Sequence, residues 1–284
     1  MATAAAPSST VPAGSAIAEW RPAHLAGLVD LIWYYRGPTV NTLKRILPTG
    51  RLELVVNLGE PYQLVSGAGT ERLASCWISG LQAGPMVVAQ PARQDVVGVR
   101  LRPAGAQALL SDTPLRVVSG LHVALRDLVG RAAEELRERL AEATTVERRL
   151  RLAARWVGDR IVRAGGLDPA VAWTAARIER SRGAVSIGAL RQHTGLSKAR
   201  MVLAFREQIG VAPKLYARTL RFGRTAELLQ GGAGRLAEVA LTAGYYDQPH
   251  MNAEFRELSG LTPREFLARR HPMGDGTTVA EPAR

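Results

Sequence analysis

Short runs of β-branched and apolar residues dominate the chain from residue 16 onward. Four such runs are bounded by Gly, Pro or Asn, which is typical of strands joined by turns. They are Arg51–Leu58, Tyr62–Val65, Met86–Ala89 and Asp95–Leu101. We therefore expect a β-rich domain over residues 16–120. Residues 1–15 are mostly small and include two prolines. Such a segment cannot offset the entropy cost of ordering, so it predicts a disordered tail.

After residue 120 the spacing of the apolar residues changes to three and four. This spacing predicts two amphipathic helices, Leu125–Leu140 and Val146–Val162, within a helical connector over 121–165. Their apolar faces could form a homodimer interface or pack on the β-rich domain. Ala164–Pro169 contains a helix stop, a glycine pair and a restart with proline in the first turn. We place a domain boundary there.

The part of the chain beyond this boundary contains an internal repeat. The residues that recur 50 positions later are Phe205, Arg206, Gly210 and Pro213, and Gly195 recurs 49 positions later as Gly244. Each copy has a short apolar helix, a turn that carries Gly, and a polar residue able to cap the next helix. This order is the helix-turn-helix pattern. It predicts two such units over 168–271, and residues 272–284 are expected to be a second disordered tail.

The second copy predicts a polar surface on its second helix. Asp247 is placed to cap this helix, and Met251, Phe255 and Leu258 are spaced to face inward. The residues left on an outward stripe are Gln248, Asn252 and Arg256, with His250 beside them. Gln and Asn side chains can bond a base edge through two hydrogen bonds, and Arg can reach guanine or phosphate. These residues are therefore candidates for reading DNA bases.

The first copy carries more charge and fewer groups suited to bases. Ser197 is placed to cap its second helix, with Met201 and Phe205 facing inward. The outward residues are Lys198, Val202 and Arg206, flanked by Arg200. We assign Arg206 to a phosphate contact. Between the copies, Pro213–Leu229 predicts one long helix whose other faces leave three arginines available, namely Arg218, Arg221 and Arg224.

Charge and composition narrow the class of protein further. The 284 residues include 37 Lys and Arg against 25 Asp and Glu, a net charge of +12, which favours a polyanionic partner such as nucleic acid. Arginine-rich composition can also follow from a GC-biased genome, so the charge alone does not decide. The length favours about two domains, and 46% hydrophobic residues exclude fibrous and disordered proteins.

Catalytic and metal chemistry find little support in the sequence. Cys76 is the single cysteine, so it excludes an internal disulfide and a multi-cysteine zinc site and favours a reducing compartment. The five histidines are isolated, and we expect no metal and no cofactor. Trp33, Tyr34 and Tyr35 form an aromatic cluster that packs in the core or lines an effector pocket. No export signal or membrane span is visible, so we expect a cytoplasmic protein without membrane contact.

Residues from about 168 to 270 resemble the DNA-binding domain of the AraC/XylS family of transcription regulators. The motifs that carry the resemblance are Gly244–His250, Glu254–Arg256, Gly260 and Thr262-Pro263 in the second unit, with Pro213–Tyr216 and Ala217–Phe222 in the linker helix. Arg191 and Leu203 in the first unit and Pro249 in the second depart from the family pattern. More loosely, Arg45–Pro48 and Val99–Pro103 resemble the β-rich regulatory domain of some members.

The resemblance implies an α+β protein with a β-rich N-terminal regulatory domain, a helical connector, and an all-α C-terminal domain of two helix-turn-helix units joined by a long helix. It implies a transcription regulator that is not an enzyme. Double-stranded DNA is then the partner, and RNA polymerase, a small-molecule effector and a second copy of the chain are further candidates. The alternative is a ligand-binding or enzymatic N-terminal domain, with the basic C-terminal half serving as an interaction module. A steep salt dependence of binding would distinguish DNA from a protein partner.

Overall fold

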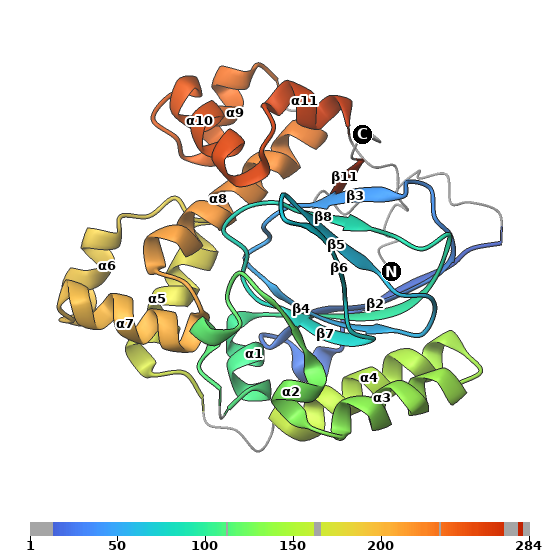
Figure 1. The fold of residues 1–284 in the computed structure, drawn as a ribbon. Coiled ribbons are helices and arrows are strands. Elements are labelled where there is room, and N and C mark those ends of the chain that lie inside the picture. Colours follow the sequence, from blue (N-terminus) through green and yellow to red (C-terminus); the bar gives the residue numbers. More distant parts are fainter. Residues whose placement is uncertain (1–13, 112, 162–165, 233, 270–277, 281–284) are drawn as a thin grey trace, which may run out of the picture.

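Two antiparallel sheets form the N-terminal part of the chain, and helices form the C-terminal part (Figure 1). This is a computed structural model, which describes residues 14–111, 113–161, 166–232, 234–269 and 278–280. The predicted α+β class, with a β-rich N-terminal part and a helical C-terminal part, is confirmed. Most of the tail expected over 1–15 lies outside the described residues.

The two sheets lie one over the other, with helices against the outer face of the first sheet (Figure 1). In spatial order, the first sheet contains β1 (Ala16–Trp20), β2 (Val29–Pro38), β9 (Arg93–Leu101), β4 (Leu52–Asn57), β7 (Cys76–Ser79) and β10 (His122–Ala124). The second contains β11 (Thr278–Ala280), β3 (Leu43–Ile46), β8 (Met86–Ala89), β5 (Gln63–Ser66) and β6 (Gly69–Arg72).

Helices connect and cover these sheets. The short 3₁₀ helices are η1 (Ala23–Leu25) and η2 (Leu115–Val117), and the α-helices of the N-terminal part are α1 (Pro103–Leu109), α2 (Leu125–Val129), α3 (Ala132–Glu142) and α4 (Val146–Ile161). The C-terminal helices are α5 (Pro169–Arg180), α6 (Ile187–Thr194), α7 (Lys198–Ile209), α8 (Pro213–Gln230), α9 (Leu236–Ala243), α10 (Gln248–Ser259) and α11 (Pro263–Ala268). Among the described residues, none of the helices combines the length and apolar character that a membrane span requires.

Alternate residues of β2 face the two sides of the first sheet, because side chains along a strand point to opposite faces. Ile32 and Tyr34 are buried on the helical side, where Arg149 of α4 hydrogen-bonds the Tyr34 hydroxyl. Trp33 and Tyr35 are half-buried and pack on the side that faces the second sheet. The predicted aromatic cluster is therefore divided between two cores.

Two parts of the chain differ from the sequence predictions. The helix expected over Leu125–Leu140 is broken at Gly130, whose φ of +63° is incompatible with a continuing helix and favours glycine. Within the tail expected over 272–284, residues 278–280 form β11, which pairs antiparallel with β3. Val279 is fully buried there, and this burial stabilises a strand that a local reading of the sequence does not show.

One continuous apolar core runs from the first sheet into the first helical unit. Val99 of β9, Leu115 of η2, Ile209 of α7 and Tyr216 of α8 all belong to it. The apolar face of α4 is also buried in this core, through residues such as Val157. Packing on the β-rich part, the second of the two alternatives for the connector helices, is therefore observed. The homodimer stays a prediction.

A histidine at the edge of the first sheet makes the fold sensitive to pH. The Nδ1 atom of His122 lies 2.8 Å from Oγ of Ser79, and burial lowers the pKa of this imidazole from its ordinary value. The unfolded chain therefore binds a proton more readily than the folded chain. Stability is retained above the unfolded pKa and falls as the pH drops through the folded pKa.

We expect a lower urea midpoint at pH 5 than at pH 7.5, and a smaller difference in His122→Gln, which cannot be charged. Circular dichroism at both pH values measures this. An equal fall in the variant would assign the pH effect to other groups.

Candidate nucleic-acid interface

Both helix-turn-helix turns have the local geometry expected from their sequences. Gly195 ends α6 with φ +67°, and Gly244 ends α9 with φ +88°, a left-handed backbone that glycine adopts without strain. The Ser197 side chain then accepts a hydrogen bond from the Arg200 backbone N–H at 3.3 Å. Asp247 accepts one from the His250 backbone N–H at 2.8 Å. The predicted caps of α7 and α10 are confirmed.

The second unit has a core of its own around α10. Met251, Phe255 and Leu258 are fully buried, as their spacing predicts. The Phe255 ring packs against Phe222 of α8 and Phe266 of α11, with centroids 4.8 and 5.4 Å apart. These contacts hold one side of α10 against α8 and α11 and leave its other side toward solvent.

The predicted base-reading residues of α10 are not equally exposed. His250 and Arg256 are exposed, whereas Gln248 and Asn252 are half-buried, and Oδ1 of Asn252 is buried without a hydrogen-bond partner. Gln248 is the first residue of α10, directly after the cap. The His250 ring meets Tyr245 edge-on, with centroids 5.3 Å apart. The exposed side of α10 therefore includes His250 and Arg256, whereas Gln248 and Asn252 of the predicted stripe are only partly open to solvent.

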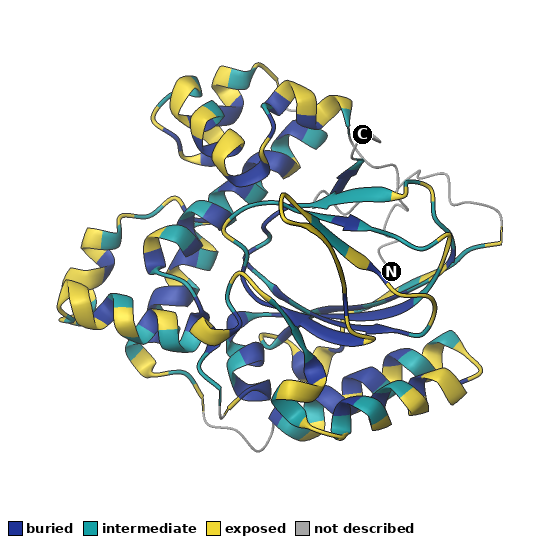
Figure 2. Ribbon diagram, in the orientation of Figure 1, coloured by how far each residue is buried: buried dark blue, intermediate teal, exposed yellow. Residues whose placement is uncertain are grey.

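The predicted residues of the first unit all reach solvent. Figure 2 shows exposed stretches along the helices of the first unit. Lys198, Arg200 and Arg206 are exposed on α7, and within the described part of the chain none of the three has an ion-pair partner. Leu203 lies between them and is 61% exposed. The end of α7 is held in place, because Glu207 pairs with Arg116 at 2.5 Å. This surface presents several unpaired cations that suit an anion such as phosphate. It presents few groups that could hydrogen-bond the edge of a base.

The arginines of the linker helix are not available as predicted. Both Arg218 and Arg221 bond the buried carboxylate of Glu254 on α10, with the shortest contacts at 2.8 and 2.7 Å. Arg218 also pairs with Glu257. The Arg221 guanidinium lies 4.6 Å from the centre of the Tyr245 ring. These arginines fix α10 on α8, because a buried carboxylate requires such partners.

Sequence reasoning missed two residues of this surface. In the sequence of α10, Glu254 cannot be told from a solvent-exposed glutamate. Only the spacing of Arg218 and Arg221, three residues apart on α8, could have indicated its partners. Tyr246 precedes the cap of α10 and is 88% exposed. An aromatic residue so open beside a recognition helix is a further candidate for contact with DNA. Burial raises the pKa of its neighbour Tyr245 to about 12, so that phenol stays neutral.

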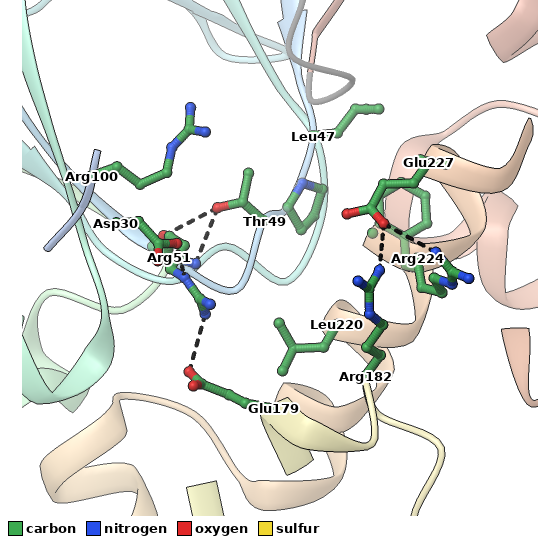
Figure 3. Close-up of a pocket in the computed structure, with 14 residues that line it drawn as sticks. Asp30, Leu47, Thr49, Arg51, Arg100, Glu179, Arg182, Leu220, Arg224 and Glu227 are labelled. Atoms are coloured by element: carbon green, nitrogen blue, oxygen red, sulfur yellow. Dashed lines mark hydrogen bonds and ion pairs between the residues drawn. The ribbon is translucent and has the colours of Figure 1, made fainter. Parts of the chain in front are cut away.

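An ionic network joins the β-rich part to the first helical unit. Arg51 lies between Asp30, at 2.5 Å, and Glu179 of α5, at 3.3 Å (Figure 3). Arg102 repeats the bridge at 2.8 and 3.1 Å. The Tyr216 hydroxyl donates to Glu179 at 2.6 Å, and burial raises the pKa of this phenol. We call these five residues the inter-domain network. It borders a cleft of about 320 Å³ between the β-rich part and α8.

Other chemistry is sparse in this region. Cys76 is buried, and burial raises its pKa to about 11, so little thiolate forms at neutral pH. Within the described residues, no three or more His, Cys, Asp or Glu side chains gather in a way that could hold a metal ion. His271 lies outside the described residues.

Two family models match the chain in separate places. A family described as "Helix-turn-helix domain" matches residues 190–269, and a domain of unknown function, DUF6597, matches residues 21–123. The first match covers α7 to α11 and the end of α6, and the second covers strands β2 to β9, together with α1.

Curated relatives match shorter parts of the chain. A putative AraC-like transcription regulator of Streptomyces antibioticus is 27% identical over 106 residues, which is 37% of this chain and 30% of that protein. The HTH-type transcriptional activator RhaR of Yersinia pseudotuberculosis is 32% identical over 65 residues, which is 23% of this chain and 22% of that protein. The chain thus matches less than a third of the length of these relatives.

Among solved structures, apo ToxT from Vibrio cholerae is 10% identical, with a TM-score of 0.49 over 84% of this chain and 96% of that chain. The helix-turn-helix match, the AraC-like relatives and the two capped units agree with one another. The C-terminal part of this chain therefore contains a helix-turn-helix domain, and the chain is similar over part of its length to AraC-like transcription regulators.

Proposed function

We propose that the protein is a sequence-specific, DNA-binding transcription regulator of the AraC/XylS type. The observation that carries the proposal is the pair of capped helices α7 and α10, which present exposed cations from two units joined by α8. Arg206 and Arg256 occupy corresponding positions on these helices. The helix-turn-helix match and the regulatory function named for the relatives support it. This function implies a cytoplasmic protein that is not an enzyme.

Salt dependence tests the proposal against a protein-binding role. The full chain is used to select operators from a randomised library of double-stranded DNA. Binding to the selected operator is then measured between about 50 and 200 mM salt. If about six phosphates are contacted, the affinity should fall about a thousandfold, because bound counterions are released from DNA. A selection without any preferred sequence, or a flat salt dependence, would favour the interaction-module alternative.

The two units are expected to contribute differently to recognition. Replacing Gln248 with Ala should weaken binding to the selected operator by about 1–3 kcal/mol and relax the preference at one or two base pairs, because a contact to a base edge is lost. Replacing Arg206 with Ala should weaken all sequences alike and reduce the salt slope, because a phosphate contact is lost. Competition against the randomised library measures both effects.

Gln192→Ala serves as the matched control, because Gln192 is exposed on α6 and outside both recognition helices. It should bind like the unmodified chain. If Gln248→Ala keeps its base preference while Arg206→Ala changes it, the roles assigned to the two units are reversed.

We also propose that an effector or a partner protein acts at the β-rich part. The side of the first sheet that faces the second carries half-buried Trp33 and Tyr35, and Trp33 donates to Glu53 at 2.5 Å. Arg100 holds the other oxygen of Glu53 at 3.1 Å. Aromatic rings beside a fixed ion pair are the kind of surface that binds small molecules. Contacts with RNA polymerase and dimer formation remain part of the proposal.

A further inference from the structure

The linker helix α8 contributes to two apolar cores, and the buried apolar residues of its two halves belong to different ones. The half-buried Leu215 in the first half also packs against the core of the second unit. Tyr216 and Ala217, in its first half, belong to the core shared with the β-rich part. Phe222 and Ala226, in its second half, belong to the separate core of the second unit. Gly223 lies at this junction. The two recognition helices are thus anchored in different cores, and α8 is the helix that belongs to both.

No packing contact requires a glycine at position 223. A Cβ built on Gly223 meets no atom within 4 Å outside the backbone of its own helix. By contrast, a Cβ on Gly183 would lie 1.9 Å from the carbonyl oxygen of Ala217, so that glycine is needed for the close approach of α5 and α8. Glycine inside a helix weakens it relative to alanine. Gly223 therefore weakens α8 at the junction without allowing a closer contact.

The space beside this junction leaves room for bending. Gly223 and Leu47 both line the cleft of about 320 Å³. Glu227 bridges Arg182 and Arg224 at the same cleft, at 2.6 and 3.5 Å, but its side chain is 61% exposed. Ion pairs at this exposure contribute little to stability.

Contacts between the second unit and the β-rich part hold the observed arrangement. Arg45 donates to the backbone oxygen of Ser259 at 3.1 Å, Leu47 packs in the core of the second unit, and β11 pairs with β3. A bend at Gly223 would break these contacts and change the angle between the two units. The helices of each unit would keep their packing on one another, while Leu47 would leave the core of the second unit.

We infer that Gly223 is a specificity-determining residue, a hinge that sets which distances between two DNA segments the recognition helices can span. This inference rests on the proposed DNA binding. Two units on one face of the duplex read segments about one helical turn apart. Each added base pair changes both the distance and the rotation between the segments. A bend in α8 lets the second unit follow that change.

Operators of varied spacing test the hinge. The spacing between the two protected segments of the selected operator is shortened or lengthened by one base pair. Gly223→Ala should bind the best spacing as the unmodified chain does, and should bind the shifted spacings about fivefold more weakly, the ratio that corresponds to the helix-propensity difference between Ala and Gly. Gly188→Ala in α6 is the control, because a Cβ there meets Oγ of Ser186 at 3.5 Å, an ordinary contact distance, and it should keep the original spacing profile.

If Gly223→Ala and the unmodified chain depend on operator spacing in the same way, the inference that Gly223 is a hinge is wrong. Failure of both proteins to prefer any operator would instead overturn the proposed function. A measurement without DNA separates the two outcomes further. Spin labels at Gln192→Cys and Leu241→Cys, both exposed, report the distance between the units in a Cys76→Ala background. We expect a narrower distance distribution in Gly223→Ala, and equal widths would contradict the hinge.

Discussion

Replacing Glu254 with alanine is expected to lower the free energy of unfolding by about 3 kcal/mol and to weaken DNA binding. Its carboxylate is only 5% exposed and accepts hydrogen bonds from Arg218 and Arg221 at distances of 2.7 to 3.1 Å. Removing one partner of a buried ion pair leaves the other charges without compensation, at a cost of about 3–5 kcal/mol. The two arginines keep some contact with water, which favours the lower end of this range.

Glu257 provides the matched control for this prediction. It pairs with the same Arg218, but its side chain is 63% exposed. Glu257→Ala should therefore change the unfolding free energy by less than about 1 kcal/mol. Urea unfolding followed by circular dichroism measures both variants, and operator binding is measured on the folded proteins. Equal midpoints for the two variants would show that burial of Glu254 does not hold α10 on α8.

The second large effect is expected at the inter-domain network. Arg51 is 14% exposed and bridges Asp30 to Glu179, so Arg51→Met removes one of the two arginines, Arg51 and Arg102, that contact both carboxylates. We expect a loss of about 3 kcal/mol in unfolding free energy, because the surviving arginine compensates only part of the buried charge.

Arg126→Met tests whether the loss depends on burial. Arg126 pairs with Glu134 at 2.9 Å, but its side chain is 70% exposed. Its replacement should change stability by less than about 1 kcal/mol. Thermal unfolding, followed by tryptophan fluorescence, reports the β-rich part through Trp33 and Trp77. If Arg51→Met and Arg126→Met unfold at the same temperature, the network does not stabilise the link between the two parts.

Local signals in the sequence were sufficient for the helix-turn-helix units. Gly195 and Gly244 end helices, and Ser197 and Asp247 cap the next ones, within a few residues of chain. Such caps depend on neighbours in sequence, so the pattern alone predicts them. The fully buried face of α10 follows in the same way from its periodic spacing. The resemblance to the AraC/XylS family depends in part on Gly244 and Asp247.

Long-range contacts could not be predicted. Glu254 has the same local pattern as an exposed glutamate, and its partners lie more than 30 residues away on α8. The strand β11 is stabilised by β3, more than 200 residues earlier in the chain. The core shared by Leu115 and Ile209 crosses the boundary placed at Ala164–Pro169. Helix α4 ends at Ile161 and α5 begins at Pro169, and the division 16–120, 121–165 and 168–271 stays a prediction.

The shared core has a consequence for chimeric regulators. Joining a foreign β-rich part to this chain at residue 166 would leave Ile209 and Tyr216 without the apolar surface that now covers them. The second unit is better suited to exchange, because most residues of its core lie between Phe222 and Phe266. A graft within α8, just before Phe222, would exchange one of the two helix-turn-helix units and keep the β-rich part, provided that the new unit has a carboxylate in the place of Glu254 for Arg218 and Arg221. An exchange of the first unit, in contrast, would also have to preserve the contacts between α7 and η2.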